Sequence, residues 1–237
     1  ACVFKSSAAV SNVFLMANVF FLSHFRILLI LFLFISQVSM VSAIDQTFAY
    51  LSFQTGTQDL ASSGGPLGSN SDYFSSLEND HGKADGDKKV RPEVFSFDFY
   101  RVSGSVASGF GIDAVRFNRS FSFADGSNVA VHGIGVLYGF NFYYRGDFWY
   151  PFFGFGTGNY TAKVQEKLYS TSVIRTSTVF GQVETPLYYK LGFRIPFNSW
   201  GILATQQYTT ADMTVPTENK TLSLGGTTTL FGVFIGF

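Results

Sequence analysis

The sequence predicts an all-β fold, an eight-stranded antiparallel up-and-down transmembrane β-barrel over residues 44–237. Three observations predict this fold class. Apolar and polar residues alternate with a period of two, as they do in strands that have one apolar face. The connections between the alternating segments are short and long in turn, which is typical of membrane barrels. After residue 44 no apolar run reaches the about 20 residues that a membrane-spanning helix needs.

Residues 1–43 are predicted to contain a secretory signal peptide helix. Arg26 precedes an apolar run over 27–35, and the small residues of Val41-Ser42-Ala43 follow it. The run is short for a membrane-spanning helix, so we expect cleavage rather than an uncleaved anchor. The mature chain then contains no cysteine, because Cys2 is the only one in the sequence. A disulfide framework and a cysteine-rich zinc site are therefore excluded.

Eight alternating segments follow the signal peptide. They are residues 46–55, 93–102, 106–117, 128–144, 148–163, 177–197, 200–211 and 222–237. The short connections are Ser103-Gly104, Arg145-Gly146-Asp147 and Asn198-Ser199, and the long ones are 56–92, 118–127, 164–176 and 212–221. In an up-and-down barrel the long connections all lie at one end, the loop end, and the short ones at the turn end. The connection 56–92 is rich in charged residues, Ser and Gly, so we expect a solvated loop.

The alternation is clearest over residues 183–195. One face carries Val183, Thr185, Leu187, Tyr189, Leu191, Phe193 and Ile195, and the other carries Glu184, Tyr188, Lys190, Gly192 and Arg194. Pro186 has no N–H to donate to a strand ladder, so it predicts a bulge. A second example sets Phe95, Phe97 and Phe99 against Ser96, Asp98 and Tyr100.

The direction of the apolar faces separates a membrane barrel from a soluble sandwich. A sandwich buries its apolar faces against each other, whereas a membrane barrel turns them to lipid. Several aromatic faces here are backed by glycines, such as Gly133, Gly135 and Gly139. Glycine weakens a strand and is a poor choice for a water-facing wall. In a narrow lumen, however, it makes room for large neighbours. We therefore expect aromatic residues to face lipid and the sheet to close, because lipid tolerates no free strand edge.

Two motifs resemble those of small bacterial outer-membrane β-barrels. The last segment, Phe231-Gly232-Val233-Phe234-Ile235-Gly236-Phe237, is similar to their C-terminal assembly signal, with Phe231, Val233, Ile235 and Phe237 as its alternating apolar positions. Residues 151–158, Pro-Phe-Phe-Gly-Phe-Gly-Thr-Gly, resemble a strand common in OmpA-like and OmpW-like barrels. The resemblance implies a location in the outer membrane of a Gram-negative bacterium and contact with outer-membrane lipid. It also implies delivery by periplasmic chaperones and insertion by the barrel assembly machinery.

Four charged residues are expected to form a polar network in the lumen. They are Asp98, Glu184, Lys190 and Arg194. Buried charges must be paired, and this set contains both signs. The network would either plug the barrel or act as a gate for small solutes. Eight strands leave little more than room for side chains, so we expect a plug.

No catalytic, cofactor or metal site is expected. His132 is the one histidine in a predicted strand, and lipid-modifying outer-membrane enzymes use a histidine with a serine or an acid. Such chemistry needs a nucleophile within hydrogen-bond reach of the base, and no serine lies at a fitting position on the same face. Asp80, Asp85 and Asp87 lack the spacing and the distal Glu of a calcium loop.

The expected function is that of a non-enzymatic outer-membrane barrel with a structural or surface-interaction role. Envelope integrity, or adhesion of the long first loop to an extracellular ligand or surface, would be such a role. The alternative is a narrow channel for small solutes, and a lipid-modifying enzyme is a more distant alternative. With 16 basic and 16 acidic residues the chain has no excess charge for binding nucleic acid.

Overall fold

A computed structural model describes residues 46–60, 72–169, 174–184, 186–216 and 219–237. The predicted signal peptide lies outside the described residues. Within the described ranges no helix has both the length and the apolar character needed to cross a membrane.

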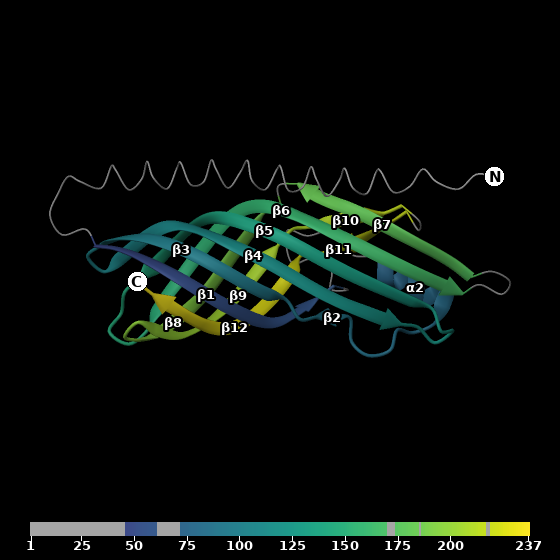
Figure 1. Cartoon of the computed structure of the whole chain (residues 1–237), viewed down its shortest axis with the longest axis horizontal. Coiled ribbons are helices and arrows are strands. Elements are labelled where there is room, and N and C mark those ends of the chain that lie inside the picture. The colour runs from purple at the N-terminus through teal and green to yellow at the C-terminus, as the bar shows by residue number, and fades with distance from the viewer. Residues whose placement is uncertain (1–45, 61–71, 170–173, 185, 217–218) are drawn as a thin grey trace. The chain divides into compact units, whose positions relative to one another are not determined.

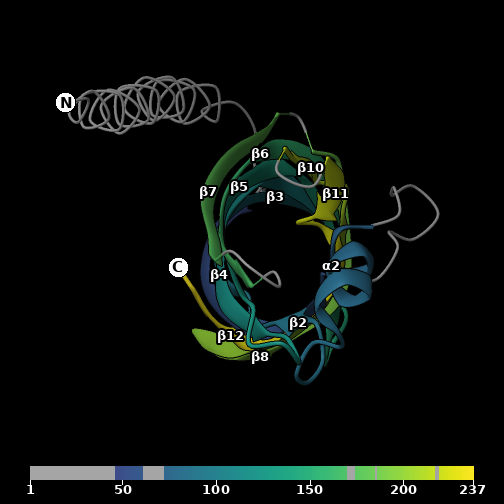
Figure 2. The same ribbon diagram turned by 90° about the vertical axis from the view of Figure 1, so that its right-hand side faces the viewer.

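All but two of the described strands form one closed antiparallel barrel (Figures 1 and 2). Its wall contains β1 (Gln46–Asp59), β3 (Glu93–Ser103), β4 (Val106–Ser122), β5 (Asn128–Tyr144), β6 (Tyr150–Tyr169), β7 (Ile174–Glu184), β8 (Tyr188–Phe197), β9 (Trp200–Thr209) and β12 (Gly226–Gly236). Both β7 and β8 pair with β6, so they share one position in the wall. The pairing of β1 with β12 closes the sheet. The predicted eight-stranded barrel is therefore confirmed.

The smaller elements lie in the long connections. The helix α2 (Tyr73–His81) and the short strand β2 (Lys89–Val90) follow β1, and β10 (Asp212–Val215) and β11 (Lys220–Ser223) form a hairpin between β9 and β12. The wall is not of even height. Strands β4, β5 and β6 have 17, 17 and 20 residues, whereas a membrane crossing takes about 9–11. These three strands are therefore longer than a membrane crossing requires.

The strand that contains Pro186 is interrupted, as predicted. Pairing with β6 stops at Glu184 and resumes at Tyr188. Across this break the alternation changes phase, because Val183 packs against the interior cluster and Tyr188 is also buried. The prediction that Val183 shares a face with Leu187 is therefore wrong. A proline without an N–H donor frees the chain at this point to shift by one residue.

In the turn-end half of the barrel, apolar side chains face outward, and the lumen holds polar side chains together with an inward cluster of mainly aromatic ones. Phe140, Phe231 and Leu191 are each more than half exposed on the outer wall. The buried polar side chains of this half are Ser52, Gln54, Ser96, Asp98, Asp113, Asn141, Lys190, Arg194, Thr205 and Gln207. This is the polarity of a wall that stands in lipid.

In the loop-end half the polarity is reversed. Most of the buried residues are now apolar, and they include Phe117, Phe121, Val129, Val131, Val164 and Leu168. Glu166 and Ser127 are buried polar exceptions. The outward positions between the buried residues are polar, as at Asn118, Gln165 and Lys167. On β4 to β6 this half therefore has an apolar core and a polar outer wall, as a domain in water has, whereas β7 exposes Ile174 and Phe180. On β5 the reversal falls between His132 and Ile134.

The first long connection is not simply the solvated loop that was predicted. Its described part folds over the loop end, where Tyr73, Phe74 and Leu77 of α2 are buried in the apolar core. The Phe74 ring packs edge-on against Phe121 of β4, with the ring centroids 4.8 Å apart. The charged residues and serines of this connection predicted a solvated loop, and the short apolar stripe on α2 was not predicted. We refer to residues 72–90 as the cap; Figure 2 shows α2 at this end of the barrel.

Candidate functional site

The lumen of the turn-end half contains two buried ion pairs. Arg194 Nη2 on β8 donates to Asp98 Oδ2 on β3 at 2.5 Å, and Lys190 Nζ donates to Asp113 Oδ2 on β4 at 2.8 Å. All four side chains are at most 6% exposed. The alternation dictates this arrangement, because Lys190 and Arg194 are four residues apart on one strand and point to the same side. Two positive and two negative charges cancel inside the barrel.

Neighbouring polar groups complete the coordination of Asp98. Asn141 Nδ2 on β5 donates to Asp98 Oδ1 at 2.8 Å. Gly111 lies between them in the wall, paired with Asp98 on one side and Gly139 on the other. A Cβ atom at Gly111 would collide with both Asp98 and Asn141. A glycine at this position therefore lets the carboxylate and the amide meet across an intervening strand.

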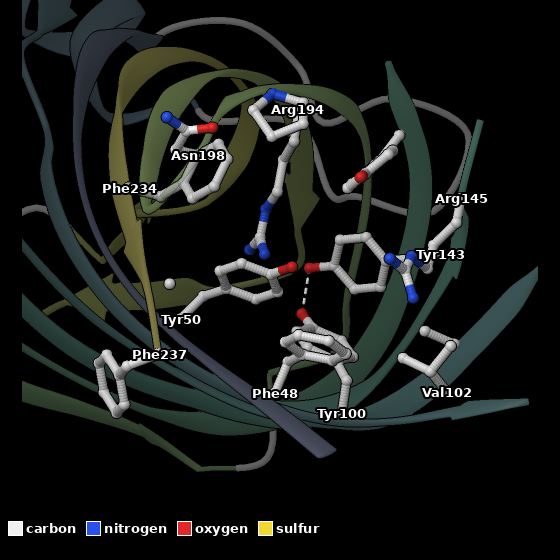
Figure 3. Close-up of a pocket in the computed structure, with 14 residues that line it drawn as sticks. Phe48, Tyr50, Tyr100, Val102, Tyr143, Arg145, Arg194, Asn198, Phe234 and Phe237 are labelled. Atoms are coloured by element: carbon white, nitrogen blue, oxygen red, sulfur yellow. Dashed lines mark hydrogen bonds between the residues drawn. The ribbon is translucent and has the colours of Figure 1, made fainter. Parts of the chain in front are cut away.

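A ring of aromatic side chains surrounds the Arg194 guanidinium (Figure 3). Its Cζ atom lies 4.6 Å from the ring centroid of Tyr50, 4.7 Å from Tyr143 and 5.3 Å from Phe234. The hydroxyl of Tyr100 donates to that of Tyr143 within this ring. Aromatic faces attract a cation, and more strongly where water is excluded. The guanidinium is thus held by one carboxylate and several ring faces.

A cavity of about 260 Å³ opens beside this cluster at the turn end. Its walls include Phe48, Tyr100 and Tyr143, and Arg194 lies at its inner side. Arg145, from the turn after β5, is exposed at its rim, with its Cζ atom 5.4 Å from the ring centroid of Phe48. Toward the loop end the lumen continues into the ion pairs and then into the apolar core.

Several polar contacts tie the cap to the wall and to the β10–β11 hairpin. Tyr73 Oη donates to the buried Glu166 Oε1 of β6 at 2.6 Å. His81 Nδ1 lies 2.8 Å from Asp125 Oδ2 in the turn between β4 and β5. The Thr221 N–H of β11 donates to Asp72 Oδ1 at 2.7 Å. Within the cap, the Lys88 ammonium lies 2.5 Å from Glu78 and holds the pKa of that carboxyl below its usual value.

A Ser-His-Asp group occurs where the cap meets the wall, but its geometry is not that of a catalytic triad. Ser127 Oγ lies 3.2 Å from His81 Nδ1, the same ring nitrogen that contacts Asp125. In a triad the acid and the nucleophile use the two different nitrogens of the imidazole. Ser127 is also fully buried, and its Oγ donates to Asp125 Oδ2. We interpret the group as a structural latch.

The structure places three of the four predicted lumen residues together. Asp98 and Arg194 form one pair, and Lys190 lies in the next layer with a partner, Asp113, that was not predicted. The side chain of Glu184 lies outside the described residues, and the alternation that grouped it with Lys190 is interrupted at Pro186. His132 faces outward and is partly exposed. Phe231, Val233, Ile235 and Phe237 are all exposed on the outer face.

Sequence reasoning missed Asp113, Asn141 and the aromatic ring around Arg194. Asp113 had a usable signal, since it is an isolated charge in a segment of alternating apolar residues. The aromatic residues had none, because Tyr50, Tyr143 and Phe234 come from strands far apart in the sequence. Only the closure of the sheet brings them together.

No family model matches the sequence, and no curated protein matches it. Solved structures of similar fold do match. Ail, the attachment invasion locus protein of Yersinia pestis, is 13% identical over 81% of this chain and 98% of its own, with a TM-score of 0.45. Neisserial surface protein A (NspA) is 10% identical over 81% and 99%, with a TM-score of 0.44. The outer membrane protein OprG from Pseudomonas aeruginosa is 17% identical over 81% and 95%, with a TM-score of 0.41. Such values assign no ligand or activity to this chain.

Proposed function

We propose that this chain is a non-enzymatic integral protein of the bacterial outer membrane with a structural or surface-interaction role. In this proposal the turn-end half is the membrane anchor, and the loop-end half with its cap is the part that meets the outside. The observation that carries the proposal is the reversal of polarity along the wall.

The outward face of the turn-end half supports the anchoring role. Its aromatic side chains form contacts around the wall, as between Phe53 and Phe95, whose ring centroids are 4.8 Å apart. A continuous band of exposed apolar side chains is unfavourable in water, at about 25 cal/mol for each Å² of apolar surface. Outer-membrane lipid removes that cost. In this proposal the barrel assembly machinery recognises the exposed C-terminal positions of β12 before insertion.

The filled lumen favours a surface role over the alternative of a solute channel. A solute entering at the turn end would meet the Arg194–Asp98 pair, then the Lys190–Asp113 pair. Beyond them lies the apolar core, in which Val131, Val164 and Leu222 are fully buried. Moving an ion through such a core has a large desolvation free energy, and the two ion pairs cannot offset it. We therefore propose that the resting barrel does not conduct.

The loop-end half supports the surface role because it presents ordered structure above the anchor. The long strands β4 to β6 form a wall with a polar outer face beyond the anchor. The cap, which is part of the first connection, packs against this wall. A binding surface that is already folded loses less entropy when a partner binds. Under this proposal the partner is an extracellular ligand or surface.

Two measurements on matched variants separate the two roles. In the first variant a Gly-Ser linker replaces residues 61–88, and in the second Asp113→Leu is combined with Lys190→Met. The surface role predicts that cells with the first variant lose surface binding, while wild-type protein in planar bilayers shows no steady conductance. Steady conductance in the wild type that changes in the second variant, together with unaltered binding by the first, would establish the channel instead.

A further inference from the structure

The turn-end cavity contains a buried guanidinium whose hydrogen-bonding capacity is only partly used. Nη2 of Arg194 donates a hydrogen bond to Asp98. The Nε and Nη1 atoms of Arg194 are buried and have no hydrogen-bond partner among the described residues. The surrounding ring faces attract the charge without accepting a directed bond as an oxygen does. Buried donors of a charged group are costly to leave without an acceptor. The geometry therefore calls for an oxygen acceptor on this side of Arg194.

The charges around the cavity favour an anion. Asp98 balances Arg194, and Lys190 is balanced by Asp113 in the next layer. Arg145 at the rim adds a second positive side chain to the lining. Its guanidinium is stacked on Phe48. An anion in the cavity would be attracted by this charge.

The shape and chemistry of the walls favour a flat apolar body on that anion. Tyr50 and Tyr100 lie with ring centroids 5.6 Å apart, and Tyr50 and Phe234 are 5.4 Å apart and edge-on. Figure 3 shows these rings arranged around the guanidinium. Aromatic side chains bind a further ring by stacking or edge contacts. A cavity of about 260 Å³ is below the range of drug-sized pockets, so one ring with one acidic group suits it.

We propose that the turn-end cavity is a binding site for a small aromatic carboxylate. The carboxylate oxygens accept hydrogen bonds from Nε and Nη1 of Arg194, the ring lies among Tyr50, Tyr143 and Phe234, and Arg145 draws the anion to the rim. This function goes beyond the surface role proposed above and does not depend on it. It requires only the closed barrel, and it lies at the opposite end from the cap.

The test is a titration of the folded protein in detergent micelles with sodium benzoate, followed by NMR of the arginine Nε–H signals. The Arg194 signal is assigned by its loss in Arg194→Lys. We expect saturable binding, with the Arg194 signal as the most strongly shifted one. Lysine keeps the charge that Asp98 needs but lacks the fork of donors, so Arg194→Lys should weaken binding, measured calorimetrically, by about tenfold or more. Arg145→Gln should weaken it about twofold to fivefold.

Three further measurements can contradict the proposal even if Arg194→Lys folds poorly. Arg145 lies on the exposed rim, so its replacement tests the site without touching the lumen. Arg116→Gln removes an exposed arginine of the loop-end half and should leave benzoate binding unchanged. Benzamide, a neutral molecule of the same shape, should bind much more weakly than benzoate. The proposal is wrong if benzoate shows only non-saturable partitioning, if benzamide binds equally well, or if Arg145→Gln and Arg116→Gln behave alike.

Discussion

The Arg194–Asp98 pair allows the filled lumen to be tested by a double-mutant cycle. Removing one partner of a buried ion pair costs about 3–5 kcal/mol, because the other charge is left buried without compensation. Both side chains are at most 2% exposed, so the folded barrel removes nearly all of their contact with bulk water. We therefore expect Arg194→Met and Asp98→Leu each to lower the free energy of unfolding by about 3–5 kcal/mol.

The double variant should be much less damaged than the sum of the two single variants. Replacing a buried pair by apolar residues of similar volume is often nearly neutral. Here Asn141 also loses the acceptor of its hydrogen bond, which costs about 1–3 kcal/mol. The double variant should therefore lose about 1–3 kcal/mol, against a sum of about 6–10 kcal/mol for additive single variants.

Urea-induced unfolding in lipid vesicles, followed by tryptophan fluorescence, measures all four corners of the cycle. The exposed pair Arg116–Glu93 is a matched control, since its atoms are also 2.5 Å apart but its side chains are 68% and 39% exposed. Its coupling should be about 1 kcal/mol or less. Additive losses at Arg194 and Asp98, or equal coupling in the two pairs, would refute the idea that a buried pair seals the lumen.

Three further predictions concern the lipid-facing wall, the cap and its pH dependence. Phe140→Lys, on the outward face of the anchor, should lower stability in vesicles by about 2–4 kcal/mol, whereas Gln165→Lys on the polar outer wall should change it by less than about 0.5 kcal/mol; equal effects would contradict the reversal of polarity. Phe74→Ala should weaken docking of the cap by about 3–5 kcal/mol, seen as faster proteolysis of the first connection with an unchanged unfolding midpoint of the barrel. The hydrogen bond from Lys88 lowers the pKa of Glu78 in the folded cap, so this pair stabilises the cap above the unfolded pKa of Glu, about 4.3, and the contribution is lost as pH falls through the lowered pKa. Proteolysis should therefore accelerate as pH falls through that range, and Glu78→Gln should flatten this dependence.

Most of the barrel could be predicted from the sequence because period-two alternation is a local signal. The segment predicted at 128–144 coincides with β5, and the tight turns fall where Gly104 and Asn198 adopt positive φ. The face assignments of Asp98, Lys190 and Arg194 follow from the same local rule. The phase change at Pro186 could not be predicted from the sequence. A proline indicates that a bulge is present, but it does not indicate by how many residues the register shifts.

Features that depend on contacts across the barrel were beyond local reasoning. The pairing of Lys190 with Asp113 joins residues from strands that are not neighbours in the wall. The residues that produce the reversal of polarity can be found in the sequence. Alternation alone, however, does not show which face of a strand points into the barrel at each position along the barrel axis. The cap was missed for a related reason. Tyr73, Phe74 and Leu77 become a core stripe only once the loop end of the barrel is there to receive them.

The measurement that tests the central claim most directly is heat-modifiability. The protein would be extracted from the membrane fraction and run on an SDS gel with and without boiling. A closed barrel whose aromatic wall stands in lipid resists SDS in the cold, so the unboiled protein should run at a different mobility and come from the outer-membrane fraction. A protein that is soluble and shows one mobility under both conditions would contradict the account, because its aromatic faces would then have to pack on each other.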